Sequence, residues 1–435
     1  MANKTIVFYS NSITSRLTYV AELIFQDLLG LSIVFTQNSN EYLNSKLPKI
    51  NYSNAPLSNS RELFIKNQTL LFENQIFEKQ IDVDFPFLLN HSPLQFDFLA
   101  TVFLLVTRYE EYVADPSIFD NHNRFSAKAS LAHRYGFLQK PIVNQWVIEI
   151  NQKLKDLYPE LKTTLTTYRF QPSFDIDMPW RYRNKGFLRS VGGICKDVSK
   201  GHFSELKNRI DILRGVKEDP DFTFDYIFDL HKLNNCAPIF FFLLGDHAEF
   251  DKNPNEKNKA FRELIHSIST NYIVGLHPSY LSNSSITILK KEKARFEKMT
   301  HLPLQISRQH FLKLRFPETY QRLLAIGVKQ DYSMGYADDI GFRASIATPF
   351  RWFDLANNEV TDLWIYPFQA MDVTLKDYLK LSPGEAVERV AALIQETKNV
   401  GGTFITLWHN SSLSDTEGWQ NWRKVYENIL FESQK

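Results

Sequence analysis

The second half of the chain alternates short apolar segments with amphipathic segments, and this alternation constrains the fold more than any other feature. Apolar residues run almost without interruption through Ala237–Leu244 and dominate Thr403–His409. Segments such as 383–399 instead show apolar residues three and four positions apart, which is typical of a helix with one buried face. Continuous apolar strands separated by amphipathic helices predict parallel strands covered by helices on the outside. A barrel and an open sheet both satisfy this pattern.

The same patterns place the remaining elements of this half. Further strands are expected at 169–177, 272–280, 305–311, around Tyr332 and at 363–367. Further helices are expected at 221–234, 257–269, 286–299, 317–326 and 374–380. We therefore predict a (β/α) domain over residues 166–435.

Residues 1–165 are expected to form a smaller N-terminal α/β domain of unknown role. A strand at 4–10, a helix at 14–29 and a strand at 31–36 give a β-α-β opening. Strands are also expected at 63–65 and 70–72, helices at 95–113 and 142–157, and a linker at 159–167. The polar segment Asp120–Arg124 is either a site or a loop, and the loop is favoured. This region carries no other recognisable chemistry.

Composition narrows the function classes. The 435 residues include 50 Lys+Arg and 49 Asp+Glu, a net charge of +1, so no nucleic-acid-binding surface is expected. The two cysteines, Cys195 and Cys236, form no CxxC motif, and so few cysteines do not make a disulfide scaffold. No segment approaches 18 uninterrupted apolar residues, so no membrane span is expected. The opening run Thr5–Ser10 is too short for a signal peptide, so a cytoplasmic location is expected.

Two carboxylates end the first strand of the second domain. Asp175 and Asp177 are two residues apart, so in extended chain both side chains point to the same side. Pro179 cannot donate to a strand ladder, so the strand should stop near Asp177. Like charges that converge in this way need a cation, a shared proton or hydrogen bonds. This pattern indicates a metal or acid/base site, with solvated loop carboxylates as the alternative.

Other strand ends in this domain carry similar chemistry. His277, Arg308, His310 and His409 all fall at or near the expected carboxyl ends of strands. In parallel α/β folds the functional side chains gather at that edge of the sheet. One histidine at a strand end is usually structural, but four strand ends that each deliver His, Asp or Arg are improbable by chance.

The order of these motifs resembles the polysaccharide deacetylase family, carbohydrate esterase family 4, over residues 168–435. The resemblance implies a distorted (β/α) barrel that removes N-acetyl groups from sugars with a divalent metal, commonly zinc. Asp175-Ile176-Asp177 resembles the first motif, which implies that Asp175 is the catalytic base and Asp177 a metal ligand. His277 resembles the first histidine of the second motif. Leu281 stands where the family has a second histidine, which is a departure from the pattern.

The later motifs supply the rest of the implied catalytic set. Arg308 resembles the arginine of the third motif, with Arg315 in Arg315-Phe316-Pro317 as a competing match. Leu407-Trp408-His409 resembles the last motif, which implies that His409 is the general acid.

A third metal ligand has to be found, because catalytic zinc usually has three protein ligands and a water. Asp177 and His277 are two, and His310 is the first choice for the third because it should project from the same side of one strand as Arg308. Tyr280 is a poorer choice, since phenolates are uncommon zinc ligands. The alternative for His310 is a hydrogen-bonded histidine in the cleft, in which case the metal binds weakly or not at all.

Four further residues are candidates for substrate binding, each with a structural alternative. Tyr280 stands beside the expected site. Arg343 would bind a carboxylate or phosphate of the substrate, or form a surface salt bridge. Asp372 would orient His409 or cap the helix that follows it, and the cap is favoured. Trp408 would wall a sugar site or pack in the core.

Taken together, these features predict a cytoplasmic, metal-dependent deacetylase-like hydrolase acting on an N-acetylated sugar or glycan precursor. The basic stretch 181–215 could receive a substrate that is an acidic or phosphate-bearing conjugate. A solvated helix face explains the basic residues equally well. Two alternatives stay open. One is an inactive glycan- or partner-binding protein on the same fold, suggested by Leu281. The other is a metal-independent hydrolase of carbon–nitrogen bonds.

Overall fold

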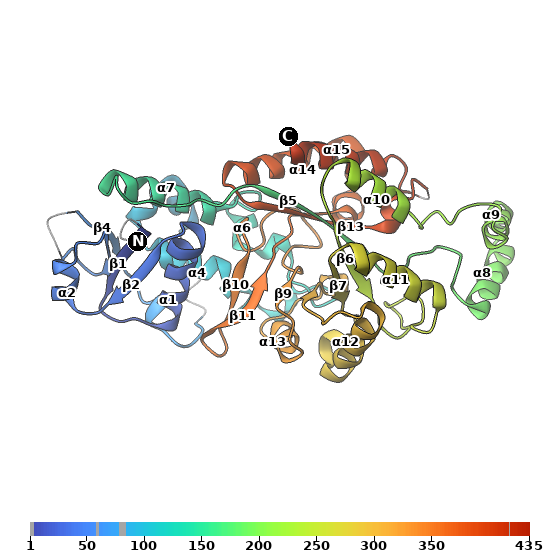
Figure 1. Cartoon of the computed structure of the whole chain (residues 1–435), viewed down its shortest axis with the longest axis horizontal. Helices are drawn as coiled ribbons and strands as arrows, with labels where there is room; N and C mark the ends of the chain where they lie inside the picture. The colour runs from blue at the N-terminus through green and yellow to red at the C-terminus, as the bar shows by residue number, and fades with distance from the viewer. Residues whose placement is uncertain (1–3, 58–60, 78–83, 417) are drawn as a thin grey trace.

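The computed structural model describes residues 4–57, 61–77, 84–416 and 418–435, and its strands form two separate sheets. The smaller sheet is parallel throughout and has the order β2 (Ser32–Thr36), β1 (Thr5–Ser10), β3 (Lys49–Ser53) and β4 (Leu63–Lys66). Figure 1 shows it at one end of an elongated molecule, with the larger sheet at the centre. The β-α-β opening predicted for the N-terminal region is present.

The larger sheet has nine strands, and only the pair at one edge is antiparallel among the strands that the structure describes. Its order is β10 (Phe350–Asp354), β11 (Glu359–Ile365), β9 (Gln330–Asp331), β8 (Ile306–Ser307), β7 (Val274–His277), β6 (Ile239–Leu243), β5 (Arg169–Ile176), β13 (Thr403–His409) and β12 (Ala370–Met371). The prediction of an α/β fold with parallel strands is confirmed.

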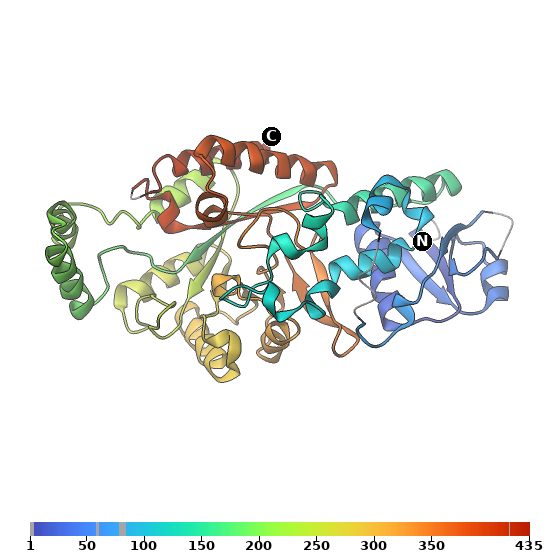
Figure 2. The same cartoon turned by 180° about the vertical axis from the view of Figure 1, so that it is seen from behind.

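Helices connect the strands and cover both sheets (Figures 1 and 2). The N-terminal region contains α1 (Ser15–Ala21), η2 (Glu22–Leu28), α2 (Ser39–Asn44), α3 (Phe85–Asn90), α4 (Phe98–Val106), α5 (Tyr109–Tyr112), α6 (Leu131–Arg134) and α7 (Ile142–Leu157). The rest of the chain adds α8 (Phe187–Ser199), α9 (Phe203–Leu213), α10 (Phe224–Leu233), α11 (Lys259–Asn271), α12 (Ile286–Thr300), α13 (Glu318–Ala325), η10 (Thr374–Tyr378), α14 (Pro383–Asn399) and α15 (Trp422–Gln434). In the described part of the chain, no helix combines the length and the apolar character that crossing a membrane requires.

Two predicted elements of the N-terminal region differ from the structure. The segment 70–72 is a 3-10 turn rather than a strand. The helix expected over 95–113 is divided into α4 and α5, because Arg108 between them has a left-handed backbone with φ of 57°. Apolar periodicity does not reveal such a break, since it reports which side chains are buried and not the backbone angle of one residue.

Alternate residues of the central strands pack on opposite faces of the larger sheet, as the period of two in a strand requires. One face packs under the covering helices and includes Phe240, Phe242, Phe404 and Trp408. The other face carries a smaller apolar cluster that includes Ile239, Phe241, Ile405 and Leu407. Burial on both faces explains why apolar residues dominate these strands.

A buried ion-pair network joins the N-terminal region to the larger sheet. Glu111 of α5 accepts hydrogen bonds from Arg343 Nε at 3.0 Å and Nη2 at 2.6 Å, and from Arg108 Nε at 2.8 Å. Arg108 also donates to the hydroxyl of Tyr336. One continuous hydrophobic core runs through both sheets alongside this network. The domain boundary near residue 165 therefore stays a prediction.

Replacement of Glu111 by glutamine is expected to lower the free energy of unfolding by about 3–5 kcal/mol, because it leaves the buried guanidinium of Arg343 without its carboxylate and takes one of two carboxylates from Arg108, which also pairs with Glu110. The loss would appear in thermal or urea unfolding of the purified variant. Asp362→Asn is the matched control, since Asp362 pairs with Lys329 at 3.6 Å while its side chain is 87% exposed. That change should cost less than about 1 kcal/mol. Equal losses of unfolding free energy in the two variants would contradict a stabilising role of the buried network.

Candidate metal centre

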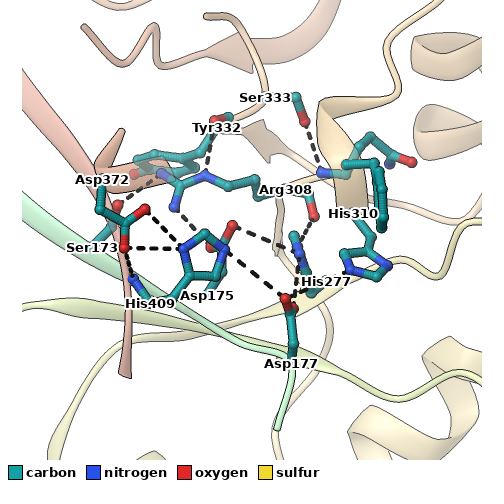
Figure 3. Close-up of polar contacts among 12 residues, drawn as sticks. Ser173, Asp175, Asp177, His277, Arg308, His310, Tyr332, Ser333, Asp372 and His409 are labelled. Atoms are coloured by element: carbon teal, nitrogen blue, oxygen red, sulfur yellow. Dashed lines mark hydrogen bonds and ion pairs between the residues drawn. The ribbon is translucent and has the colours of Figure 1, made fainter. Parts of the chain in front are cut away.

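Strand order brings the predicted site residues together. Strands β13, β5, β6, β7 and β8 are consecutive neighbours in the larger sheet, and all five are parallel. Their carboxyl ends therefore lie along one edge. In the register of the sheet His409 is opposite Asp175, and Leu243 is opposite His277. Figure 3 shows the side chains from these strand ends converging on Asp177.

Asp177, His277 and His310 form a group suited to a metal ion. One ligand atom from each lies within 4.8 Å of the other two. His277 Nε2 is 3.4 Å from Asp177 Oδ1, and His310 Nε2 is 3.6 Å from Asp177 Oδ2. These are the three residues that were expected as ligands from the sequence, and the group includes His310, the first choice for the third ligand.

The second nitrogen of each histidine is held by an acceptor. His277 Nδ1 lies 2.6 Å from the carbonyl oxygen of Arg308, and His310 Nδ1 lies 2.9 Å from Asp251 Oδ1. An acceptor at Nδ1 fixes the proton there and leaves the Nε2 lone pair directed at Asp177, as in metal sites where a carbonyl or carboxylate orients the ligand. Asp177 Oδ1 is buried and has no hydrogen-bond partner among the described residues. A carboxylate with an imidazole nitrogen beside each of its oxygens, and with Oδ1 unpaired, fits a divalent cation.

The charges around these atoms also favour a cation. Burial alone would raise the pKa of the Asp177 carboxyl, but His310, His277 and His409 outweigh burial and hold its pKa well below the ordinary value. Burial would lower the pKa of His310, yet Asp177 and Asp251 raise it to about 9. Burial lowers the pKa of His277 in spite of Asp175 and Asp177 nearby. A proton on His310 and a metal ion would therefore compete, and metal binding should release that proton.

His310 reaches this position from a turn rather than from a strand. The sequence placed Arg308 and His310 on one strand, but β8 ends at Ser307 and His310 begins a 3-10 turn. The backbone N–H of Arg308 still donates to Leu276, and that of His310 to Pro278. This alternation continues the hydrogen bonding to the neighbouring segment past the end of β8, and it keeps the two side chains on the same side.

Asp175 lies next to the metal group and is fixed by Arg308. Arg308 Nη1 donates to Asp175 Oδ1 at 2.9 Å, Nη2 donates to the hydroxyl of Ser173 at 2.8 Å, and Nε donates to the carbonyl of Tyr332 at 3.0 Å. The other carboxylate oxygen, Oδ2, is 3.6 Å from His277 Nε2. Asp175 is thus a buried carboxylate that borders the metal group but has a cationic partner of its own.

His409 completes the cluster from the end of β13. Its Nδ1 lies 2.9 Å from Asp372 Oδ1, and its Nε2 lies 3.9 Å from Asp177 Oδ2. Burial lowers the pKa of His409, but Asp372, together with Asp177 and Asp175, raises it to about 10. Asp372 therefore orients His409, whereas the sequence favoured a helix cap. The N-cap of η10 is Val373, without a side-chain capping bond.

Two cavities meet at the cluster. A cavity of about 190 Å³ is lined by Asp175 and His277 and by the apolar side chains Leu312, Met371, Val373 and Leu407. A second cavity of about 290 Å³ is lined by the polar side chains Asp221, Lys252, Asn410 and Ser411 and by the apolar side chains Met178 and Phe250. Asp177, His310, Phe311 and His409 line both. A substrate can thus extend to either side of the cluster.

The other sequence candidates lie in different surroundings. Arg343 is buried with Glu111 in the network described above, and Trp408 is buried on the opposite face of β13, where it packs on Tyr426. Neither lines the two cavities. Trp408 is adjacent to His409 in β13, so its side chain points to the other face of the sheet. Tyr280 is partly buried and packs on Phe250, at a ring distance of 4.4 Å, near the second cavity. Arg315 stacks on Phe119, so Arg308 is the arginine that reaches Asp175.

Asp251 is a site residue that the sequence analysis missed. It is fully buried in the loop after β6 and accepts hydrogen bonds from His310 Nδ1 and from the backbone N–H of Tyr280. The loop lies at the same sheet edge as the other strand ends. Its sequence neighbours Asp246 and His247 are exposed, and no local pattern separates Asp251 from them.

Asp251→Asn is expected to weaken zinc binding by roughly 10–100-fold, because the carboxylate that orients His310 and raises its basicity is lost. Zinc titration against a competing chelator would measure the change. Asp246→Asn in the same loop is the control, since its carboxylate pairs with Lys291 and Arg295 outside the cluster. Identical zinc affinities for the Asp251→Asn variant and the wild type would show that Asp251 does not contribute to zinc binding.

A family model described as a family of unknown function, DUF7033, matches residues 6–159. No curated protein matches the chain. A proposed polysaccharide deacetylase from Mycobacterium smegmatis has 12% sequence identity and a TM-score of 0.39 over 61% of this chain and 84% of that one. A mutant of a CE4 family pseudoenzyme with restored enzymatic activity has 14% identity and a TM-score of 0.28, over 60% and 63%.

These structures come from the family that the motifs of residues 168–435 resemble. At such identities and TM-scores the likeness carries no conclusion about this chain. Its chemistry has to be inferred from the residues at the metal centre.

Proposed function

We propose that the protein is a metal-dependent hydrolase that removes an acetyl group from the nitrogen of a sugar or glycan precursor. The observation that carries the proposal is that a ligand group fit for a cation borders a separate carboxylate, Asp175, and an imidazole, His409. Amide hydrolysis needs an activated water, a group that takes its proton and a group that protonates the leaving amine.

Asp177, His277 and His310 would hold the metal, and zinc suits a ligand set of two histidines and one carboxylate. When bound, a divalent metal lowers the pKa of a water and polarises the acyl carbonyl. Asp175 is kept out of the ligand group by its hydrogen bond to Arg308, which leaves it able to accept a proton from water. Arg308 is a positioning residue for Asp175.

His409 is the proposed acid. With Nδ1 committed to Asp372, the proton on Nε2 is the one that faces the cavities, and the raised pKa keeps it in place at neutral pH. Transfer of that proton to the departing nitrogen would let the carbon–nitrogen bond break to give a neutral amine.

The sugar part of the substrate is proposed to occupy the cavity of about 290 Å³, where hydroxyl, amide and charged groups suit a polyhydroxylated ligand and the rings of Phe250 and Phe311 offer apolar surface. The basic hairpin of α8 and α9 projects away from the body in Figure 1 and lines neither cavity, so an acidic conjugate would have to meet Lys252 instead. We also propose that the larger sheet is a distorted (β/α) barrel, because its second face has an apolar cluster of its own. The cytoplasmic location stays a prediction.

Metal-dependent release of acetate is the test. Protein stripped with a chelator and reloaded with zinc should bind about one ion per chain and release acetate from N-acetylglucosamine oligomers or from a phosphate-bearing N-acetyl sugar. Acetate release that survives chelation would favour the metal-independent hydrolase. Failure to bind zinc would reject the mechanism and favour a binding module. Zinc binding without acetate release from either substrate would reject the deacetylase.

A further inference from the structure

The hairpin Phe119–Phe125, which belongs to the N-terminal region, reaches the metal centre. Phe119 and Phe125 pair in an isolated antiparallel bridge, and Asp120 Oδ1 accepts hydrogen bonds from the backbone N–H groups of His122 and Arg124 at 2.9 Å each. These bonds make the tip a rigid turn. Figure 2 shows this part of the chain, in cyan, extending from the smaller sheet across to the larger one.

Arg124 connects the hairpin to the wall of the 190 Å³ cavity, which it also lines. Its side chain is nearly buried and pairs with Asp120 Oδ2 at 2.7 Å. Nη1 donates to the carbonyl oxygen of Phe311 at 3.1 Å, and Nη2 donates to the hydroxyl of Tyr378 at 2.8 Å. Phe311 and Tyr378 line the same cavity. One guanidinium from the N-terminal region thus ties two segments of the cavity wall together.

Phe311 needs such support because its backbone is strained. Phe311 and Leu312 both have left-handed angles, with φ of 59° and 53°, directly after the metal-group residue His310. Bulky residues rarely adopt this conformation, because it is unfavourable for side chains with a Cβ and persists only where the surroundings impose it. The ring of Phe311 packs against His122 at 4.8 Å and against Phe250 at 5.3 Å. The hairpin therefore holds both the carbonyl and the ring of Phe311.

The position of Phe311 matters because it lies where the two cavities meet. Of the four residues that line both cavities, Asp177, His310 and His409 carry the proposed chemistry, and Phe311 is an apolar ring. Leu312, Met371, Val373 and Leu407 line only the first cavity, and Asp221, Lys252, Asn410 and Ser411 line only the second. Its ring is placed to separate a group bound in the first cavity from a group bound in the second.

We propose that the hairpin Phe119–Phe125 is part of the substrate-binding site and that Arg124 is a positioning residue for Phe311. Phe311 would divide a subsite for a short acyl group in the first cavity, against its four aliphatic side chains, from a subsite for the amine-bearing carrier in the second cavity. The inference deepens the proposed hydrolysis and rests on it for the identity of the two groups. It assigns a role in this site to the N-terminal region.

Arg124→Met tests this role, because methionine keeps much of the apolar stem and removes every N–H donor. We expect the KM for N-acetylglucosamine oligomers to rise about tenfold or more, as for loss of a hydrogen bond from a charged group, while kcat and zinc content stay close to wild type. Phe311→Leu should reproduce the rise. The double variant should add little to either single change, because coupled residues are non-additive. Lys128→Met, an exposed change shortly after the hairpin, is the control.

Hydrogen exchange gives a readout that needs neither metal nor turnover. In the wild type the N–H groups of Leu312 and Lys313 are hydrogen-bonded to Gln309 and His310. In metal-free Arg124→Met these two amides should exchange about tenfold faster, with no change in the Lys128→Met protein. Tyr378→Phe removes one Arg124 bond and leaves the hairpin intact, so it should give a smaller change in the same direction. If the Arg124→Met protein does not fold, exchange in the Tyr378→Phe protein tests the inference in its place.

Acetohydroxamate, a zinc-binding acyl analogue, separates failure of this inference from failure of the proposed function. If the wild type hydrolyses no N-acetyl sugar but binds acetohydroxamate, and Arg124→Met binds it at least about tenfold more weakly, the deacetylase is rejected and the role of Arg124 stands. If the wild type is active and Arg124→Met matches Lys128→Met in KM, in acetohydroxamate affinity and in exchange, the inference is overturned. Effects of Arg124→Met and Phe311→Leu that simply multiply would also overturn it.

Discussion

Asp177→Asn is expected to reduce bound zinc from about one ion per chain to nearly none and to abolish hydrolysis. Asp177 is the carboxylate that both histidines of the ligand group approach, since each Nε2 atom lies near one of its oxygens. Asparagine removes the negative charge and can present only one oxygen. Metal analysis of the purified protein measures the first effect, and acetate release measures the second. Zinc should also raise the melting temperature of the wild type and not that of the variant, because a ligand stabilises only a folded state that binds it.

Asp175→Asn is the matched comparison for Asp177→Asn. It removes a carboxylate two residues away, from the same strand end, but that carboxylate is hydrogen-bonded to Arg308 rather than placed in the ligand group. It should keep its zinc while losing activity. Loss of zinc from both variants, or from neither, would contradict the division between a metal ligand and a proton acceptor.

His409→Gln is expected to lower kcat by about 10²–10⁴-fold while zinc content stays near one per chain, since general acid catalysis contributes factors of this size. His409 lies beyond the ligand group, with its Nε2 3.9 Å from Asp177 Oδ2. His266→Gln, which changes an exposed histidine on α11, should leave kcat unchanged. A His409→Gln enzyme with wild-type kcat would assign the proton transfer to another group.

The pH dependence follows from the same histidine. Asp372 and the neighbouring carboxylates raise the pKa of His409 to about 10. The acid form is therefore present at neutral pH and is lost as the pH rises through that value. Asp372→Asn removes the nearest negative charge, so the pKa of His409 should fall and the alkaline limb of the kcat profile should move to lower pH. A limb that stayed in place would show that Asp372 does not act through His409.

The strand-end residues could be predicted from the sequence because they follow local rules. A strand reveals itself by apolar composition, parallel strands share one edge for their carboxyl ends, and polar residues just past such runs must therefore be near that edge. These rules selected Asp175, Asp177, His277 and His409. They also selected His310, although it projects from a turn, because the hydrogen bonds of the preceding segment continue past the strand.

Residues that reach the site through long-range packing could not be found in this way. Asp251 acts on His310 across 59 positions of the chain, and Arg124 reaches Phe311 across 187. Neither contact leaves a periodic or spaced signal. The surroundings of Arg343 and Trp408 could not be predicted from the sequence either. Which groups a side chain contacts depends on how its segment is placed in the fold and on what packs against it.

The sequence by itself determined the class of fold and the residue types at one edge of the larger sheet, because composition and periodicity are local consequences of burial. Only the tertiary structure decided the strand order, the orientation of each imidazole, and the approach of the hairpin Phe119–Phe125 to the metal centre. Those depend on contacts between segments far apart in the chain, and the energies of such contacts are fixed by shape and register rather than by any short run of residues.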